Sequence, residues 1–207
     1  MPGTYTVKMT RGTETYRTQL VVTLDPRAKF NLEDRQAELD AAMRVYRLLG
    51  DMSFAVDRIN GVRDALADRS ARVKNDAAFA KQLEGLSQKV DELRKKIVAT
   101  KEGGAVTGEE RIREKTTALY GNFVFYEGRP ADYQVARIDS LKKELGDVET
   151  EFDSLVAKEL PAVNKLLAKK KLEAIQQLTR KAWDAANGDS GGTAGPSGVS
   201  CSAEGHS

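Results

Sequence analysis

Apolar residues recur at spacings of three, four and seven along most of this sequence, and this periodicity constrains the fold more than any other feature. Such spacing places the apolar side chains on one face of an α-helix. The longest stretch starts at Asn31, a typical N-cap residue, and continues to about Val73. It predicts one helix several times longer than the usual mean of roughly 11 residues. Its apolar face is formed by Leu32, Leu39, Met43, Tyr46, Leu49, Met52, Val56, Ile59, Val62 and Leu66.

Two shorter stretches follow with the same alternation. The first comes after a capping signal at Asn75 and Asp76 and predicts a coiled-coil-like seam that ends before residues 101–104. Its members are Phe79, Leu83, Leu86, Val90, Leu93 and Ile97. A third helix is expected to begin with a capping box formed by Thr107 and Glu110 and to break at residues 128–130. Its apolar face consists of Ile112, Leu119, Phe123 and Tyr126.

The last two predicted helices lie on either side of Pro161. The fourth starts at Ala131 and carries a second seam of Ile138, Leu141, Leu145, Val148, Phe152 and Leu155. Pro161 is expected to end it and start a fifth helix, which frays near Trp183 and carries Val163, Leu166, Leu167, Leu172, Ile175 and Leu178. Because apolar faces must be covered, the predicted fold class is mainly α, an antiparallel bundle of long coiled-coil-like helices over residues 27–186.

Residues 1–26 follow a different rule. Apolar and polar residues alternate on both sides of a turn at Arg11–Thr13, and Asp25 and Pro26 stop the second run, which predicts a β-hairpin. An isolated hairpin is marginally stable and exposes two unpaired edges. Either the helices cover one of its faces, or the chain begins inside a domain whose earlier strands are missing. The second interpretation is favoured.

Residues 187–207 are rich in glycine and serine and are expected to be a disordered tail. The one cysteine, Cys201, and the one histidine, His206, both lie there. Triads, Cys–His pairs and His-ligated zinc sites all need an imidazole held rigidly beside its partner. The sequence therefore predicts no catalytic, cofactor-binding or metal-binding residue, and no cofactor.

Charge and hydropathy exclude two kinds of partner. The chain has 33 Lys and Arg against 31 Asp and Glu, with the signs interspersed, so we expect no nucleic-acid binding. No apolar run approaches the roughly 20 residues that cross a bilayer, so we expect no membrane span. The first residues do not form a signal peptide, and the compartment stays open.

Several groups resemble sites but have a simpler structural interpretation. Glu109 with Glu110, and Glu149 with Glu151, are too close in sequence to face each other across a substrate, and nothing apolar nearby is expected to raise a pKa. The cluster of Lys165, Lys169, Lys170 and Lys171 is expected to be a solvated helix end without interleaved aromatic residues.

The aromatic and glycine-rich positions are interpreted in the same way. The densest aromatic group, Tyr120, Phe123, Phe125 and Tyr126, is expected to be packing rather than a ligand shelf. Gly103–Gly104 and Gly121 match no phosphate-loop spacing, and Trp183 lies too close to the tail to support a pocket.

A family resemblance covers most of residues 2–180. The chain resembles the C-terminal region of bacterial sortilin-like (VPS10-like) BNR-repeat proteins, which are often labelled glycosyl hydrolases. The resemblance rests on Pro2-Gly3-Thr4-Tyr5-Thr6-Val7, Leu24-Asp25-Pro26-Arg27, Leu119-Tyr120-Gly121-Asn122, Tyr126-Glu127-Gly128-Arg129-Pro130 and Val156-Ala157-Lys158-Glu159-Leu160-Pro161-Ala162-Val163-Asn164. It implies that residues 1–26 end an Ig-like module, that any substrate site lies on a β-propeller absent from this chain, and that the parent protein is exported or periplasmic.

Three functional hypotheses follow from these observations. The first is a non-catalytic structural or interaction domain whose partner is a protein, either its own missing propeller or another chain. The second is an accessory domain of a carbohydrate-active enzyme. The third is a self-associating coiled-coil adaptor, a homo-oligomer closed through the Leu83–Ile97 or the Ile138–Leu155 seam.

Overall fold

The computed structural model describes residues 1–101 and 108–187 of the chain. In these residues a β-hairpin, β1 (Gly3–Arg11) and β2 (Glu14–Val22), precedes five helices. The helices are α1 (Leu32–Arg72), α2 (Ala77–Ile97), α3 (Ile112–Val124), α4 (Asp132–Lys169) and α5 (Arg180–Asn187). The predicted fold class, mainly α with an N-terminal hairpin, is confirmed. Asn187, the first residue of the predicted tail, ends α5, and residues 188–207, with Cys201 and His206, lie outside the described residues.

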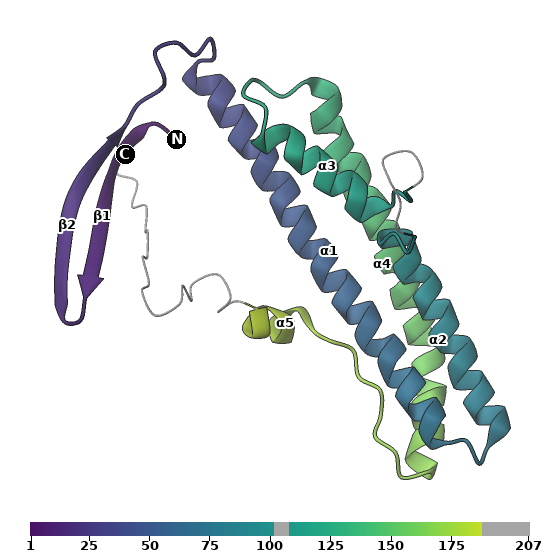
Figure 1. The fold of residues 1–207 in the computed structure, drawn as a ribbon. Coiled ribbons are helices and arrows are strands. Elements are labelled where there is room, and N and C mark those ends of the chain that lie inside the picture. Colours follow the sequence, from purple (N-terminus) through teal and green to yellow (C-terminus); the bar gives the residue numbers. More distant parts are fainter. Residues whose placement is uncertain (102–107, 188–207) are drawn as a thin grey trace.

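The long helices form a bundle in which α2 and α3 together serve as one interrupted rod. Figure 1 shows α1 and α4 running along the molecule, with α2 beside the lower half of α1 and α3 beside its upper half. α1 packs against α2, α3 and α4 and is therefore the central helix of the bundle. α2 and α3 follow each other in one direction, antiparallel to α1 and to α4 (Figure 1).

The starts of α1 and α2 follow the sequence signals. Asn31 caps α1: its Oδ1 accepts from the Asp34 backbone N–H at 2.9 Å, and the Asp34 carboxylate accepts from the Asn31 N–H at 3.2 Å. The Asp76 carboxylate accepts from the Phe79 N–H at 3.1 Å at the start of α2. Both caps satisfy backbone donors that a helix leaves unpaired.

The start of α3 was predicted wrongly. The helix begins at Ile112, with Arg111 as its N-cap, and the Glu114 carboxylate accepts from the Arg111 N–H at 3.1 Å. Glu110 therefore precedes the helix, and Thr107 lies outside the described residues. The prediction failed because Glu110 and Glu114 can each serve as the acidic residue of a capping box, and only the fold selects between them.

Pro161 does not end the fourth helix, contrary to the prediction. α4 continues through Pro161 to Lys169. Proline loses one backbone hydrogen bond, but Leu160 and Val163 on either side are buried in the core, with 6% and 0% of their surface exposed. Because the buried face extends to Leu167, packing outweighs the local penalty.

The predicted fifth helix does not form as one element, because residues 162–169 belong to α4 and residues 170–179 are not helical. α4 ends at Lys169 in a Schellman motif, in which the Leu172 N–H donates to the Leu167 carbonyl and the Lys171 N–H donates to that of Ala168. Lys171 occupies the left-handed region with φ of 59°, where glycine is usual, so the sequence carried no visible stop signal. The chain then returns along the bundle, with Ile175 buried, before α5 begins.

The two seams predicted for α2 and α4 close inside the chain. All six α2 residues from Phe79 to Ile97 are buried, as are the α4 residues from Ile138 to Phe152 that were assigned to its seam. At the last predicted position Val156 is buried and Leu155 packs only partly against the core. Among the described residues, every buried apolar residue lies between Ala41 and Ile175, so the hairpin contributes none.

Candidate functional site

The N-terminal half of α1 carries two apolar stripes, and the core uses the one that the sequence did not select. Ala41, Val45 and Leu48 are buried. The predicted members Leu32, Leu39, Met43 and Tyr46 are instead 53%, 39%, 37% and 58% exposed, which corrects the prediction for this half of the helix. Leu39, Met43 and Tyr46 lie three to four residues apart and so share one face. We call these three residues the outer stripe.

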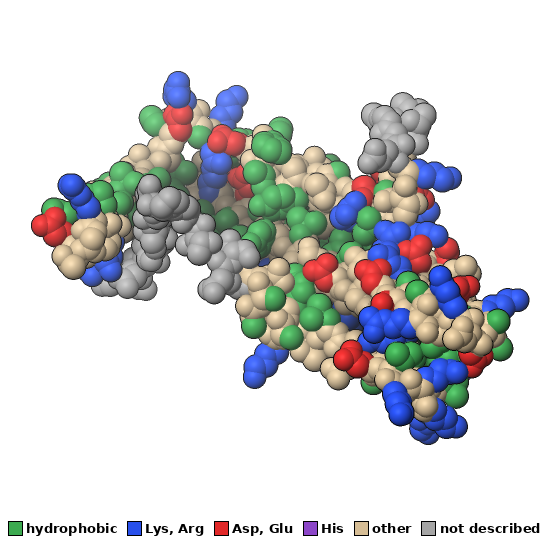
Figure 2. Space-filling view, turned by 60° about the horizontal axis from the view of Figure 1, so that its bottom comes forward, with side chains coloured by type: hydrophobic (Ala, Val, Ile, Leu, Met, Phe, Trp, Pro, Cys, Tyr) green, Lys and Arg blue, Asp and Glu red, His purple; other side chains and the backbone are tan. Residues whose placement is uncertain are grey.

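A groove of about 460 Å³ separates the outer stripe from the base of the hairpin. Leu39 and Met43 of α1 and Phe123 and Val124 of α3 line one side, and Val22 and Leu24 line the other. In Figure 1 the hairpin and α1 diverge from this point like the arms of a V. Figure 2 shows hydrophobic side chains reaching the surface in the half of the molecule that carries the hairpin.

The hairpin is amphipathic, and its apolar face is open. A two-residue turn at Gly12 and Thr13, with φ of 59° at Gly12 as a type II′ turn needs, fixes a register without a bulge. Because side chains alternate across a strand, Tyr5 and Leu20, Val7 and Thr18, and Met9 and Tyr16 share one face. Met9, Tyr16 and Leu20 are 50–57% exposed.

The aromatic group is divided between core and surface, so the packing interpretation holds for only part of it. Phe123 is 3% exposed and Tyr120 packs partly against the core. Phe125 and Tyr126 are 89% and 72% exposed, because α3 ends at Val124 and the chain turns away from the bundle. This extends the exposed apolar surface from α1 to the end of α3.

Further along the same side of α1, the C-terminal segment already covers the helix. The Trp183 ring meets the Phe54 ring edge-on at 5.8 Å, and its indole N–H donates to Asp57 at 2.7 Å. Arg180 pairs with Asp51 at 2.8 Å. Trp183 therefore anchors α5 on α1, while the outer stripe toward the N-terminus has no such cover within the described residues.

The paired carboxylates do not form an acid–base pair. Glu109 accepts from the Thr100 N–H and pairs with Arg111, and these contacts lower its pKa. Glu151 pairs with Lys96. Burial raises the pKa of Glu149, with Asp51 adding to the effect, so the expectation that nothing nearby would raise a pKa was wrong. Glu110 is exposed.

The lysine cluster does not converge on one site. Lys170 pairs with Asp76 at 2.8 Å and lies 5.8 Å from the centre of the Phe79 ring, which ties the end of α4 to the start of α2. Lys171 occupies the left-handed cap position, and Lys165 and Lys169 are exposed on α4. Gly103 and Gly104 lie outside the described residues, and Gly121 lies within α3.

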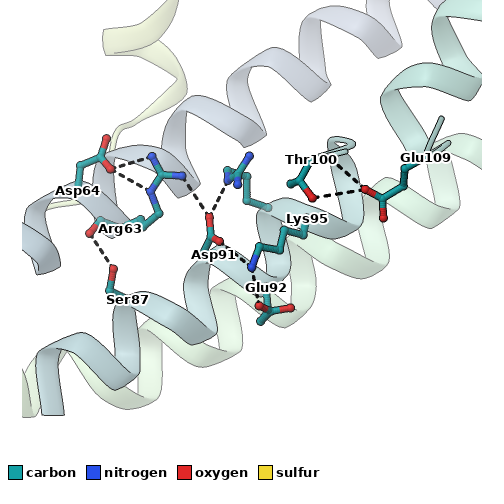
Figure 3. Close-up of polar contacts among 9 residues, drawn as sticks. Arg63, Asp64, Ser87, Asp91, Glu92, Lys95, Thr100 and Glu109 are labelled. Carbon is teal, nitrogen blue, oxygen red and sulfur yellow. Dashed lines mark hydrogen bonds and ion pairs between the residues drawn. The ribbon is translucent and has the colours of Figure 1, made fainter. Parts of the chain in front are cut away.

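The densest polar network joins α1 to α2 and is structural (Figure 3). The Asp91 carboxylate accepts from Arg94 at 2.8 Å, Lys95 at 3.0 Å and Arg63 at 3.2 Å. Partial burial alone would raise the pKa of Asp91, but hydrogen bonds from Arg94, Lys95 and Arg63 outweigh it and lower the pKa from 3.8 to about 2. The network pins the two helices together and leaves no free acid.

We expect Asp91→Asn to destabilise the fold by about 1–2 kcal/mol at pH 7, allowing for partial exposure. Because folding lowers this pKa, the carboxylate stabilises the fold above about pH 4 and loses that effect as the pH falls toward about 2. The difference between wild type and variant in urea denaturation should therefore shrink over this window. Glu92→Gln, at a carboxylate with 67% exposure, is the matched control and should change stability by less than about 0.5 kcal/mol. A deficit independent of pH would contradict this account.

In the part of the chain that the structure describes, no three His, Cys, Asp or Glu residues converge as metal ligands. None of the helices described there is long and apolar enough to span a bilayer. Comparison of the chain with protein-family models, with curated proteins and with solved structures found no match. The V-shaped apolar surface, formed by the hairpin face, the outer stripe and the end of α3, is therefore the candidate site.

Proposed function

We propose that this chain is a non-catalytic interaction domain that docks a protein through the V-shaped apolar surface. The observation that carries the proposal is the contrast within α1. Ala41, Val45 and Leu48 are buried in the core, whereas the outer stripe lies across an open groove from the base of the hairpin. Contiguous exposed apolar surface beside polar residues is typical of protein–protein contact sites.

The sequence resemblance points to the parent protein as the docked partner. In the proposal, the chain serves as the C-terminal region of a sortilin-like β-propeller protein, and the hairpin joins β-structure supplied by the parent protein. An amphipathic hairpin with open edges is suited to this role because it can extend a sheet. An accessory role in a carbohydrate-active enzyme is the alternative, and it rests on the resemblance alone.

The adaptor hypothesis receives less support in its original form. The Leu83–Ile97 seam and most of the Ile138–Leu155 seam are buried within one chain. A dimer closed through these seams would first have to open the core, at a cost of several buried leucine-sized side chains of roughly 1.5–3 kcal/mol each. Any self-association should therefore use another surface.

A pair of methionines on α1 tests whether the V-shaped surface is reserved for docking. Met43, in the outer stripe, is 37% exposed, and Met52, nine residues later, is 2% exposed. We expect Met43→Gln to change the free energy of unfolding by less than about 1 kcal/mol and Met52→Gln to lower it by about 2–5 kcal/mol, because only the second buries an amide in the core. Chemical denaturation followed by circular dichroism measures both.

The opposite pattern would end the proposal. If Met43→Gln destabilised the chain as much as Met52→Gln, the outer stripe would be part of the chain's own core and would not be free for a partner.

A further inference from the structure

We propose that the partner of the V-shaped surface is a second copy of this chain, with the apolar hairpin face of each copy packed against the outer stripe and the α3 end of the other. The inference rests on the proposed function and names its partner. A reciprocal contact of this kind is isologous, so a two-fold axis closes the assembly at a dimer.

The two surfaces match in kind. The hairpin offers a flat row of alternating side chains, including Val7, Met9 and Leu20, and the outer stripe offers Leu39 and Met43. Each is amphipathic and uncovered over the described residues, and each is the type of surface that buries the other in sheet-on-helix packing. Exchange between copies covers both surfaces of both chains at once.

The connection between hairpin and bundle permits the exchange. Residues 23–30 form hydrogen bonds and ion pairs only among themselves within the described residues: Arg27 pairs with Asp25, and the Ala28 N–H donates to the Asp25 carbonyl. No ion pair or side-chain hydrogen bond joins residues 3–22 to the described helices. Reorienting the hairpin therefore breaks little, which is the usual condition for exchange of an element between protomers.

Charge favours the same pairing. The hairpin carries three cations, Lys8, Arg11 and Arg17, and one carboxylate, Glu14. The first three turns of α1, residues 32–43, carry four carboxylates and one arginine: Glu33, Asp34, Glu38, Asp40 and Arg35. Arg129 pairs with Glu33 and Asp34, and Arg35 pairs with Glu38, so this end of α1 keeps a net negative charge of two. Lys8 and Arg17 are direct cross-strand neighbours, an unfavourable arrangement that nearby carboxylates relieve. Because the ribbon is only two strands wide, their long side chains can reach round its edges.

The area is sufficient for a dimer. A strand pair of nine residues each is about 30 Å long and about 10 Å wide, so one face covers about 300 Å². Counting both partners, two reciprocal contacts bury about 1,200 Å², the lower end of the range for stable specific interfaces. A hairpin folding back onto its own α1 would bury the same area per chain, about 600 Å², and cross-linking between chains distinguishes the two arrangements.

The first test is the mass of the full-length chain by light scattering over a wide range of concentrations. We expect a concentration-dependent dimer whose dissociation constant rises at least tenfold with Leu20→Ser, on the apolar hairpin face. Gln19→Ser, at the next residue on the polar face, is the matched control and should change it less than twofold. A chain that stays monomeric throughout, or a dimer insensitive to Leu20→Ser, overturns the proposal.

The second test identifies which surfaces meet, using Cys201→Ser as background. Chains carrying only Val7→Cys are mixed with chains carrying only Met43→Cys and treated with a short bismaleimide. We expect a covalent heterodimer, and several-fold less of it when Thr6→Cys, on the opposite hairpin face, replaces Val7→Cys. If the two cysteines cross-link only when placed in one chain, the hairpin closes on its own helix and the exchange is wrong.

The outcome is separable from that of the proposed function. A monomer in which Met43→Gln leaves stability unchanged rejects the second copy but keeps the docking surface for a different protein. A chain that Met43→Gln destabilises as strongly as Met52→Gln rejects both.

Discussion

Replacing Phe152 by alanine is expected to lower the free energy of unfolding by about 3–5 kcal/mol, the largest effect of any single truncation considered for this chain. Phe152 lies on α4 with 1% of its surface exposed, and the Arg58 guanidinium lies 5.1 Å from the centre of its ring. The substitution leaves a cavity where α4 meets α1 and removes the cation–π contact, worth roughly a further 0.5–1 kcal/mol. Equilibrium urea unfolding followed by far-UV circular dichroism would measure the loss.

The same substitution at Phe125 provides the control. Phe125 is 89% exposed just after α3, so Phe125→Ala should change stability by less than about 0.5 kcal/mol. Because domains of this size have only about 5–15 kcal/mol of stability, the difference should also appear as separate thermal midpoints. Equal effects of the two substitutions would mean that the assignment of core and surface aromatics is wrong.

The second large effect is expected at Asn164, which holds the returning C-terminal segment against α4. Its side-chain amide donates to the Ile175 carbonyl at 3.1 Å, and its Oδ1 accepts from the Ile175 N–H at 2.8 Å. Ile175 is 3% exposed, so both backbone groups lie beside a buried side chain. Asn164→Ala should cost about 2–3 kcal/mol, because it removes two hydrogen bonds and leaves a backbone donor and acceptor without partners.

Loss at Asn164 should also be local, which distinguishes it from loss of core packing. Amide hydrogen exchange should speed up at residues 172–178 far more than in α2, because only the returning segment loses its anchor. Asn187→Ala removes a single exposed hydrogen bond to the Trp183 carbonyl and serves as the matched control, with an expected change below about 0.5 kcal/mol. Unchanged exchange at residues 172–178 would contradict the anchoring role.

Local signals were sufficient where the chain had one way to satisfy them. The α2 seam from Phe79 to Ile97 is buried in full, and α1 starts at its predicted cap, Asn31. The hairpin was equally predictable from the sequence, because the alternation of apolar and polar residues on both sides of Gly12 determines the register of the strands. In each case spacing and one or two capping or turn residues pointed to a single arrangement.

The candidate site could not be predicted from local sequence signals in the same way. Leu39, Met43 and Tyr46 have the spacing of a core stripe, and nothing in their identity marks them as exposed. The stripe of Ala41, Val45 and Leu48, two residues further along and so on the opposite side of the helix, is buried instead, and α1 packs there against its neighbours in the bundle. The exposed aromatics after α3 depend on the same choice.

The sequence by itself determined the elements: which segments are helical, where most of them begin, and that the first residues form an amphipathic hairpin. Only the tertiary structure decided which apolar face of α1 is buried, that α4 continues through Pro161, and that it ends at Lys169 with Lys171 in place of the usual glycine. The physical reason is the range of the interactions. Periodicity, caps and turns act over a few residues and are written in the local sequence, whereas burial is a competition among distant segments for the same surface, and packing can outweigh a local preference of a few kcal/mol.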